Sequence, residues 1–358
     1  MSEFDDYGRD SEVSDILADL IQQQGGSPHS DLIMDLMRTV LKLVEDRTGR
    51  GDIKVIRSAL KEMRYSFKVF RPYRGRRKVT VFGSARTRPE EASYKQAVAF
   101  AKAITDYGFM VITGAGPGIM HAAQEGAGRE ESFGVNIRLP FEQDANEVIF
   151  GDPKLVNFKY FFTRKLIFVK ESDAIVLFPG GFGTHDEGFE SLTLIQTGKT
   201  DPMPLVCLDC PESDYWGEWD RYVKGHLLAR GLISEDDLAL YKITDSIDEA
   251  CEEILHFYHV YNSCRWVQGQ MVLRLNHRLT DAAVEELNDN FSDIVVSGKI
   301  AKSAALPSEG NEPETLRLPR LVFNFNRRQY GRLRQLIDAI NASPLESEPR
   351  EEVQRSTR

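Results

Sequence analysis

The chain has 358 residues, of which 41% are hydrophobic, and its formal net charge is -10. That charge argues against non-specific nucleic-acid binding, and no apolar run reaches the roughly 18 residues that a membrane helix needs. The first residues lack the basic and apolar blocks of a signal peptide. We therefore expect a globular, cytoplasmic protein without nucleic-acid or membrane partners.

The chain opens with an acidic and polar stretch, residues 1–30, that closes on Gly25-Gly26-Ser27-Pro28. This composition predicts a mobile arm or a short helix that ends in a linker. Apolar residues then recur at helical spacing from residue 31 to about residue 70, which predicts a helical extension over residues 31–74. We expect this extension to pack against the main domain or a partner subunit.

A basic run precedes the first predicted strand, and a solvated linker is its favoured interpretation, with phosphate binding or regulation as the alternative. The run consists of Arg71, Arg74, Arg76, Arg77 and Lys78.

Short apolar segments alternate with helical ones over residues 75–262, which predicts an α/β domain with a Rossmann-like, doubly wound parallel sheet. The predicted strands cover residues 79–83, 110–114, 133–139, 174–179 and 204–208, and the predicted helices lie near residues 89–107, 119–127, 184–196 and 246–258. In such sheets ligands bind beyond the carboxyl ends of the strands.

Residues 266–343 predict a small C-terminal α+β unit for regulation or assembly, followed by a disordered tail over residues 344–358. Its arginines suggest an anionic effector, and a solvated basic helix is the alternative. The predicted strands are 271–275, 293–300 and 318–325, the helices are 280–290 and 327–340, and the polar insert 303–315 is expected to be a loose loop.

Four cysteines are too few and too scattered for a disulfide framework, so we expect reduced thiols. Cys207 and Cys210 have the C-x-x-C spacing that zinc and redox sites use, but no second pair exists. A strand end that carries two thiols is therefore the favoured interpretation, and the sequence predicts neither a metal site nor a cofactor.

The most informative segment is a glycine turn, residues 179–187, which follows an apolar run and leads into a predicted helix. Its glycines allow close backbone approach to a ligand, and Thr184 is expected to cap the helix so that the first amides face a phosphate. A carboxylate one turn further in, Glu187, would repel phosphate and is expected to face the other end of a phosphorylated ligand.

Two further loops end strands of the same predicted sheet. Gly83, Ser84 and Arg86 follow the first strand, where the hydroxyl and the guanidinium can donate to a ligand. Gly114 and Gly116 follow the second, but their spacing does not match the G-x-G-x-x-G dinucleotide fingerprint. The acidic residue that would bind a ribose is also missing, so a nicotinamide dehydrogenase is not expected.

The turn resembles the P-G-G-x-G-T-x-x-E signature of the LOG family, named after the plant protein Lonely Guy and often labelled lysine decarboxylase. Arg164 and Lys165 occupy the place of that family's M-H-x-R-K signature, although Phe161 and Phe162 stand where Met and His are usual. His185 likewise replaces a residue that is more often aliphatic. The resemblance covers roughly residues 75–260, and the sequence has no signature of a pyridoxal-bearing lysine.

The resemblance implies a phosphoribohydrolase that cleaves AMP, or a related purine or cytokinin nucleotide, into free base and ribose 5-phosphate, as a homodimer or larger homo-oligomer. It implies catalytic roles for Arg164 and Glu187. Phosphate binding is implied for Gly180, Gly181, Gly183 and Thr184, and further substrate contacts are expected from Gly83, Ser84, Arg86, Gly114, Gly116 and Lys165. The alternative is a non-catalytic carrier of a nucleotide or of the molybdenum cofactor.

The residues support the same chemistry, because breaking a ribose–base bond builds positive charge on the ribose. A carboxylate such as Glu187 would stabilise that charge and orient or deprotonate the attacking water. Arg164 would fix the ribose or the phosphate, and we expect it to hold Glu187 ionised by lowering its pKa.

Overall fold

The computed structural model describes residues 3–138, 145–309 and 313–346, and the chain forms two compact units, residues 1–64 and 65–358. The first unit contains α1 (Glu3–Gln23), α2 (Ser30–Glu45) and most of α3 (Arg50–Phe70). Residues 1–30, expected to be a mobile arm or a short helix, thus contain a helix of 21 residues. Among the described residues, no helix is long and apolar enough to cross a membrane.

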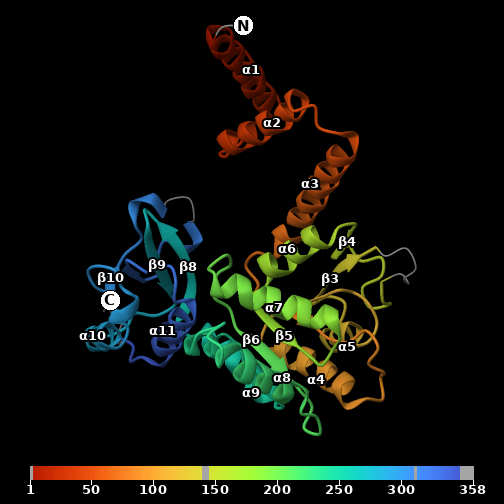
Figure 1. Cartoon of the computed structure of the whole chain (residues 1–358), viewed down its shortest axis with the longest axis vertical. Helices are drawn as coiled ribbons and strands as arrows, with labels where there is room; N and C mark the ends of the chain where they lie inside the picture. Colours follow the sequence, from red (N-terminus) through yellow and green to blue (C-terminus); the bar gives the residue numbers. More distant parts are fainter. Residues whose placement is uncertain (1–2, 139–144, 310–312, 347–358) are drawn as a thin grey trace, which may run out of the picture. The chain divides into compact units, whose positions relative to one another are not determined.

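The second unit is built on a seven-stranded sheet in which every neighbouring pair is parallel, with the strand order β4-β3-β2-β1-β5-β6-β7. The predicted doubly wound sheet is therefore confirmed. Its strands are β1 (Lys78–Phe82), β2 (Met110–Thr113), β3 (Ser132–Ile137), β4 (Leu155–Phe158), β5 (Ala174–Leu177), β6 (Leu205–Leu208) and β7 (Lys242–Thr244). Figure 1 labels β3, β4, β5 and β6 of this sheet.

Helices cover both faces of this sheet, which explains why its central strands β1, β2 and β5 are buried at every position and mostly apolar. On one face, Val79 and Val81 of β1 pack with α4 (Ala92–Asp106), α5 (Ile119–Ala127) and α9 (Ile247–Phe257). On the other face, Phe82 of β1 packs with residues of three more helices. These are α6 (Phe161–Glu171), α7 (Phe182–Gln196) and α8 (Tyr215–Tyr222).

The strand order reverses at β1, which lies between β2 and β5. The three glycine-containing loops follow these three strands, at Gly83, Gly114 and Gly180. Because the carboxyl ends of parallel strands meet at one edge, the loops come together where open α/β sheets bind ligands.

The C-terminal part folds around a four-stranded antiparallel sheet in the order β10-β11-β9-β8. Its helices share one core with the sheet, and η3 (Glu235–Leu240) of the preceding part packs against the last helix. The elements are β8 (Tyr261–Val267), β9 (Gln270–Leu275), α10 (Asp281–Asn290), β10 (Ala301–Ser303), β11 (Arg320–Phe323) and α11 (Tyr330–Ala342). The predicted α+β unit is confirmed.

Two predictions within this unit are wrong. The strand expected over residues 293–300 is absent from that described range, where η4 (Ser292–Ile294) and a loop precede β10. The insert expected to be loose contains η5 (Pro307–Glu309), and the Glu309 carboxylate is buried between Arg274 and Arg320 at 2.9 and 3.3 Å. Residues 310–312, and most of the tail predicted to be disordered, lie outside the described residues.

Candidate active site

A cavity of about 670 Å³ lies at the carboxyl ends of β1 and β5. It is lined by residues 82–86, Met120, Phe161, Arg164 and residues 180–187, and we call it the glycine-turn cavity. Nine of the predicted site residues line it together: Gly83, Ser84, Arg86, Arg164, Gly180, Gly181, Gly183, Thr184 and Glu187.

The glycine turn leads directly into α7, whose N-cap is Gly181. The expectation that Thr184 caps this helix is wrong, because no side chain caps it and Thr184 lies buried inside its first turn. A Cβ atom at Gly180 would lie 2.1 Å from the Thr184 Oγ1 atom, so only glycine fits at position 180. The first amides of a helix have no acceptor within it, so this N-terminus can bind an anion at the cavity.

The loop after β1 is held between the glycine turn and α5. The Ser84 amide donates to the Pro179 carbonyl at 3.1 Å, and the Ser84 carbonyl accepts from the Ile119 amide at 3.0 Å. Gly118 has a φ of +66°, and a Cβ atom there would lie 2.2 Å from the Ser84 carbonyl oxygen. The backbone thus fixes the Ser84 hydroxyl at the cavity wall, where it accepts from the Arg86 amide and can still donate to a ligand.

Glu187 lies inside α7 with 5% of its surface exposed. Burial raises the pKa of its carboxyl group to about 7, although the positive charges of Lys165 and Arg164 act in the opposite direction. Arg164 therefore lowers the pKa of Glu187, as expected. The expectation that this keeps Glu187 fully ionised is wrong, because the cost of burying the charge exceeds the attraction of the two cations. At neutral pH the site holds both the ionised and the protonated carboxyl.

Arg164 projects from α6, and its guanidinium lies 5.2 Å from the centre of the Phe168 ring. Gly114 and Gly116 do not line the cavity themselves. A Cβ atom at either glycine would lie 2.7 Å from the side chain of Met120, which does line it. The two glycines therefore shape the cavity wall by making room for Met120.

Lys165, expected to contact the substrate, lies outside the glycine-turn cavity. Its Nζ atom is 2.8 Å from Asp186, 3.7 Å from Glu187 and 2.5 Å from Glu190. Lys165 thus contacts the buried Glu187 carboxylate from outside the glycine-turn cavity.

Sequence reasoning missed the support beneath the turn. The Tyr215 hydroxyl of α8 donates to the Gly180 carbonyl and lies 2.6 Å from the His185 Nε2 atom. Since the tyrosine proton is used on Gly180, the imidazole Nε2–H donates to the Tyr215 oxygen. Burial lowers the pKa of His185, which agrees with this neutral form. The sequence gives no signal for this contact, because Tyr215 lies 35 positions from the carbonyl group that it binds.

The two cysteines at the end of β6 are buried in the protein and are not bonded to each other. Cys207 and Cys210 are free and buried, and burial raises the pKa of the Cys207 thiol. The Asp209 carboxylate accepts from the Trp216 amide at 3.1 Å and so holds the start of α8. Within the described ranges, no group of three or more metal-binding side chains is placed to hold an ion.

Comparison with known proteins places this domain in a family. Residues 117–254 match the family model described as "Possible lysine decarboxylase". The cytokinin riboside 5′-monophosphate phosphoribohydrolase of Mycobacterium tuberculosis is 32% identical over 111 residues, which make up 30% of this chain and 52% of that protein. The match thus spans about half the length of this curated relative.

Three solved structures resemble about half of the chain. A molybdenum cofactor binding protein from Rippkaea orientalis is 19% identical, with a TM-score of 0.36 over 49% of this chain and 94% of that one. The molybdenum cofactor carrier protein of Chlamydomonas reinhardtii is 20% identical, with a TM-score of 0.34 over 49% and 93%. DNA processing protein A from Helicobacter pylori is 17% identical, with a TM-score of 0.35 over 51% and 82%.

None of these structural similarities is high enough to support a function. The family match, in contrast, includes the whole glycine turn with Glu187, as well as Arg164 and Lys165. The chain therefore carries a domain of the LOG family, the family whose model is described as a possible lysine decarboxylase.

Proposed function

We propose that this protein is a nucleoside 5′-monophosphate phosphoribohydrolase that hydrolyses the N-glycosidic bond of AMP, or of a related purine or cytokinin nucleotide. One observation carries the proposal: the glycine turn, Arg164 and the buried Glu187 line one cavity of about 670 Å³. The glycine turn would then serve as the anion site for one end of a nucleotide, and Glu187 would face the other end. The curated relative's name supports the same reaction class.

The glycine turn would bind the 5′-phosphate. The free amides at the start of α7 and the positive end of its dipole favour an anion there. Arg86, on the facing loop, would add a guanidinium that can bind phosphate in bidentate fashion. Binding energy from this remote group would orient the ribose against Glu187.

Glu187 would act in its ionised form. Departure of the base leaves positive charge on the ribose C1′ atom, and the carboxylate would stabilise it while it takes a proton from the attacking water. A pKa of about 7 makes the carboxylate a better base than an exposed glutamate and still leaves about half of it ionised at neutral pH. Arg164, in the same cavity, would hold the ribose hydroxyls or the phosphate.

The test is incubation of the full chain with AMP, followed by chromatography for adenine and ribose 5-phosphate. We expect Glu187→Gln to lower the rate by about 10²–10⁴-fold, the usual range for loss of a general base. The matched control is Glu190→Gln, which removes the same charge three residues further along α7 but lies outside the glycine-turn cavity. It should retain turnover within about tenfold.

Two outcomes would contradict the proposal. Equal rates in Glu187→Gln and the wild type would remove the assigned catalytic group. Tight nucleotide binding without base release from AMP, or from a panel of other nucleoside monophosphates, would favour a carrier of a nucleotide or of the molybdenum cofactor.

We further propose a homodimer or larger homo-oligomer, which light scattering of the purified chain would test.

A further inference from the structure

A second and larger cavity, of about 1120 Å³, lies between the parallel-sheet domain and the C-terminal unit. Its walls are formed by residues 74–77, one side of α6, the loop 199–203, Tyr258 and residues 261–263, and we call it the junction cavity. No residue of the glycine turn lines it. It is therefore distinct from the candidate active site.

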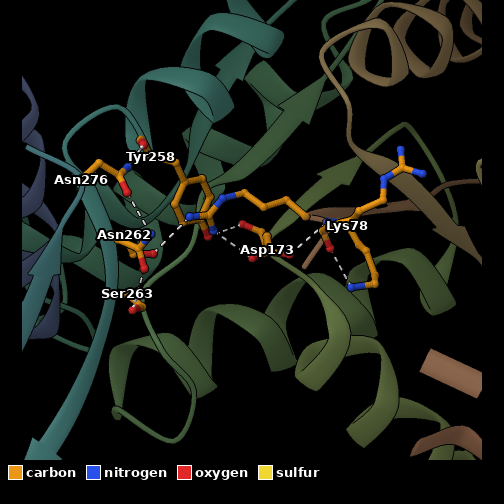
Figure 2. Close-up of polar contacts among 8 residues, drawn as sticks. Lys78, Asp173, Tyr258, Asn262, Ser263 and Asn276 are labelled. Atoms are coloured by element: carbon orange, nitrogen blue, oxygen red, sulfur yellow. Dashed lines mark hydrogen bonds and ion pairs between the residues drawn. The ribbon is translucent and has the colours of Figure 1, made fainter. Parts of the chain in front are cut away.

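Part of its wall is fixed by Arg77, which bridges the two parts of the unit. The guanidinium donates to the Asp173 carboxylate at 3.0 Å and to the Asn262 carbonyl at 3.2 Å, and it lies 3.5 Å from the centre of the Tyr258 ring. Figure 2 shows Asp173 beside Lys78 on one side and Tyr258 with Asn262 on the other. This member of the basic run is thus engaged, where a solvated linker was expected.

Two basic side chains of the junction cavity are left without an ion pair in the described part of the chain. Arg74 and Lys199 line it, and neither side chain has an ion-pair partner among the residues that the structure describes. Six lining side chains are basic and four are acidic: Arg74, Arg76, Arg77, Lys165, Lys170 and Lys199 against Asp173, Glu190, Asp201 and Glu314. Unneutralised cations in a concave site attract anions, and arginine and lysine both bind phosphate groups.

Lys165 connects this cavity to the candidate active site. It lines the junction cavity, whereas Glu187, 3.7 Å from its Nζ atom, lines the glycine-turn cavity. Only 14% of the lysine side chain is exposed, because Glu190 and Asp186 also hold its ammonium group. A charge placed on the junction side therefore acts on Glu187 across a single side chain.

We propose that the junction cavity binds a small phosphorylated anion, and that this ligand controls the ionisation of Glu187 through Lys165. Arg74 and Lys199 would hold the phosphate. The exposed apolar side chains of Phe162 and Leu166 line the same cavity and would contact the rest of the ligand. The control half of this inference rests on the proposed hydrolase function, whereas the binding half does not.

The direction in which the ligand would shift the pKa of Glu187 follows from the charges around that residue. The charged groups that act on it are Arg164 and Lys165 from α6, and Asp186 and Glu190 from its own helix. An anion beside Lys165 offsets its positive charge, so the proton on Glu187 becomes harder to remove. If the pKa rises by about one unit from about 7, the ionised fraction at pH 7 falls about fivefold, whereas at pH 9 it hardly changes. The ligand is therefore an inhibitor at neutral pH whose effect disappears in alkali.

Binding is tested by calorimetric titration of the full chain with inorganic pyrophosphate. We expect Arg74→Ala/Lys199→Ala to lose at least tenfold in affinity. A matched control, Lys102→Ala/Arg328→Ala, removes two exposed charges that line neither cavity and should bind as the wild type does. Arg86→Ala removes a cation of the glycine-turn cavity and so reveals any pyrophosphate that binds there instead. Heat that is lost only in Arg86→Ala, or that survives in all variants, would overturn the proposed site.

Control is tested by the pH dependence of AMP hydrolysis with and without saturating pyrophosphate, at matched ionic strength. We expect the acidic limb to move to higher pH in the wild type and in the control variant, but not in Arg74→Ala/Lys199→Ala. A limb that stays in place while pyrophosphate binds at the junction cavity would refute the coupling. Absence of AMP hydrolysis altogether would contradict the proposed function instead, because the calorimetric result does not depend on turnover.

Discussion

Replacement of Lys165 by methionine should move the pH dependence of the proposed reaction without removing either proposed catalytic group, Arg164 or Glu187. The methionine keeps most of the side-chain length but removes the ammonium group 3.7 Å from Glu187. At that distance two charges interact by about 4 kcal/mol for an effective dielectric constant of 20, which corresponds to about three pKa units. Because Asp186 and Glu190 share the same ammonium group, we expect about one to two units.

The pKa of Glu187 would then rise from about 7 to about 8–9. Ionised Glu187 would become scarcer at neutral pH, so kcat/KM for AMP in Lys165→Met should fall about 5–50-fold at pH 7 and return to within about twofold of the wild type at pH 9.5. The assay is release of adenine between pH 5.5 and 9.5. Lys170→Met, on the same helix and paired with Glu171, is the matched control and should keep the wild-type profile.

The reasoning fails if the acidic limb of Lys165→Met coincides with that of the wild type. It also fails if activity is lost equally at every pH while the melting temperature falls, because Lys165 would then act only by holding α6 against α7.

Three further predictions concern stability. The Glu187 pKa is raised on folding from 4.5 to about 7, so the folded chain should lose up to about 3 kcal/mol of stability as the pH rises through that window, and Glu187→Gln should abolish the loss in denaturant titrations at pH 5 and pH 8. Gly180→Ala should lower both the melting temperature and AMP turnover because its Cβ atom would overlap Thr184, whereas Gly181→Ala, with no atom within 4 Å of its Cβ position, should keep the wild-type melting temperature. Glu309→Gln should destabilise the fold by about 3–5 kcal/mol by leaving two buried arginines without their carboxylate, and a denaturation midpoint that does not move would contradict the buried ion pairs.

Much of the fold follows from local sequence signals. The strands β1, β2, β5 and β6 are apolar at nearly every position because helices cover both faces, and these were predicted. β8 was missed because its residues alternate irregularly between buried and half-exposed positions. Glu309 was expected in a loose loop because its neighbours are polar, and its burial depends on an arginine 35 residues away.

In the candidate site too, some features follow from local sequence signals and others depend on how the helices pack. That the glycine turn, Arg164 and Glu187 line one cavity could be predicted, because these residue types stand in a recognisable order in the sequence, whereas their catalytic roles stay a prediction. The net pKa of Glu187 could not be predicted, because it depends on how closely α7 packs onto the sheet. The position of Lys165 depends on which side of α6 faces α7, and one residue of difference along a helix turns a side chain by about 100°. Adjacent residues in a signature, Arg164 and Lys165, therefore line different cavities.

At Glu187, folding stability and the proposed function make opposite demands. A carboxylate with 5% exposure lowers folding stability at neutral pH, since the cost of burying its charge exceeds the attraction of Lys165 and Arg164. A glutamine of similar shape would avoid that cost, but it could not take a proton from water. A stronger pairing with Lys165 would also avoid the cost, but it would lower the pKa and weaken the base. The lysine held by three carboxylates at once thus leaves Glu187 only partly neutralised, which is the condition in which a buried carboxylate can accept a proton near pH 7.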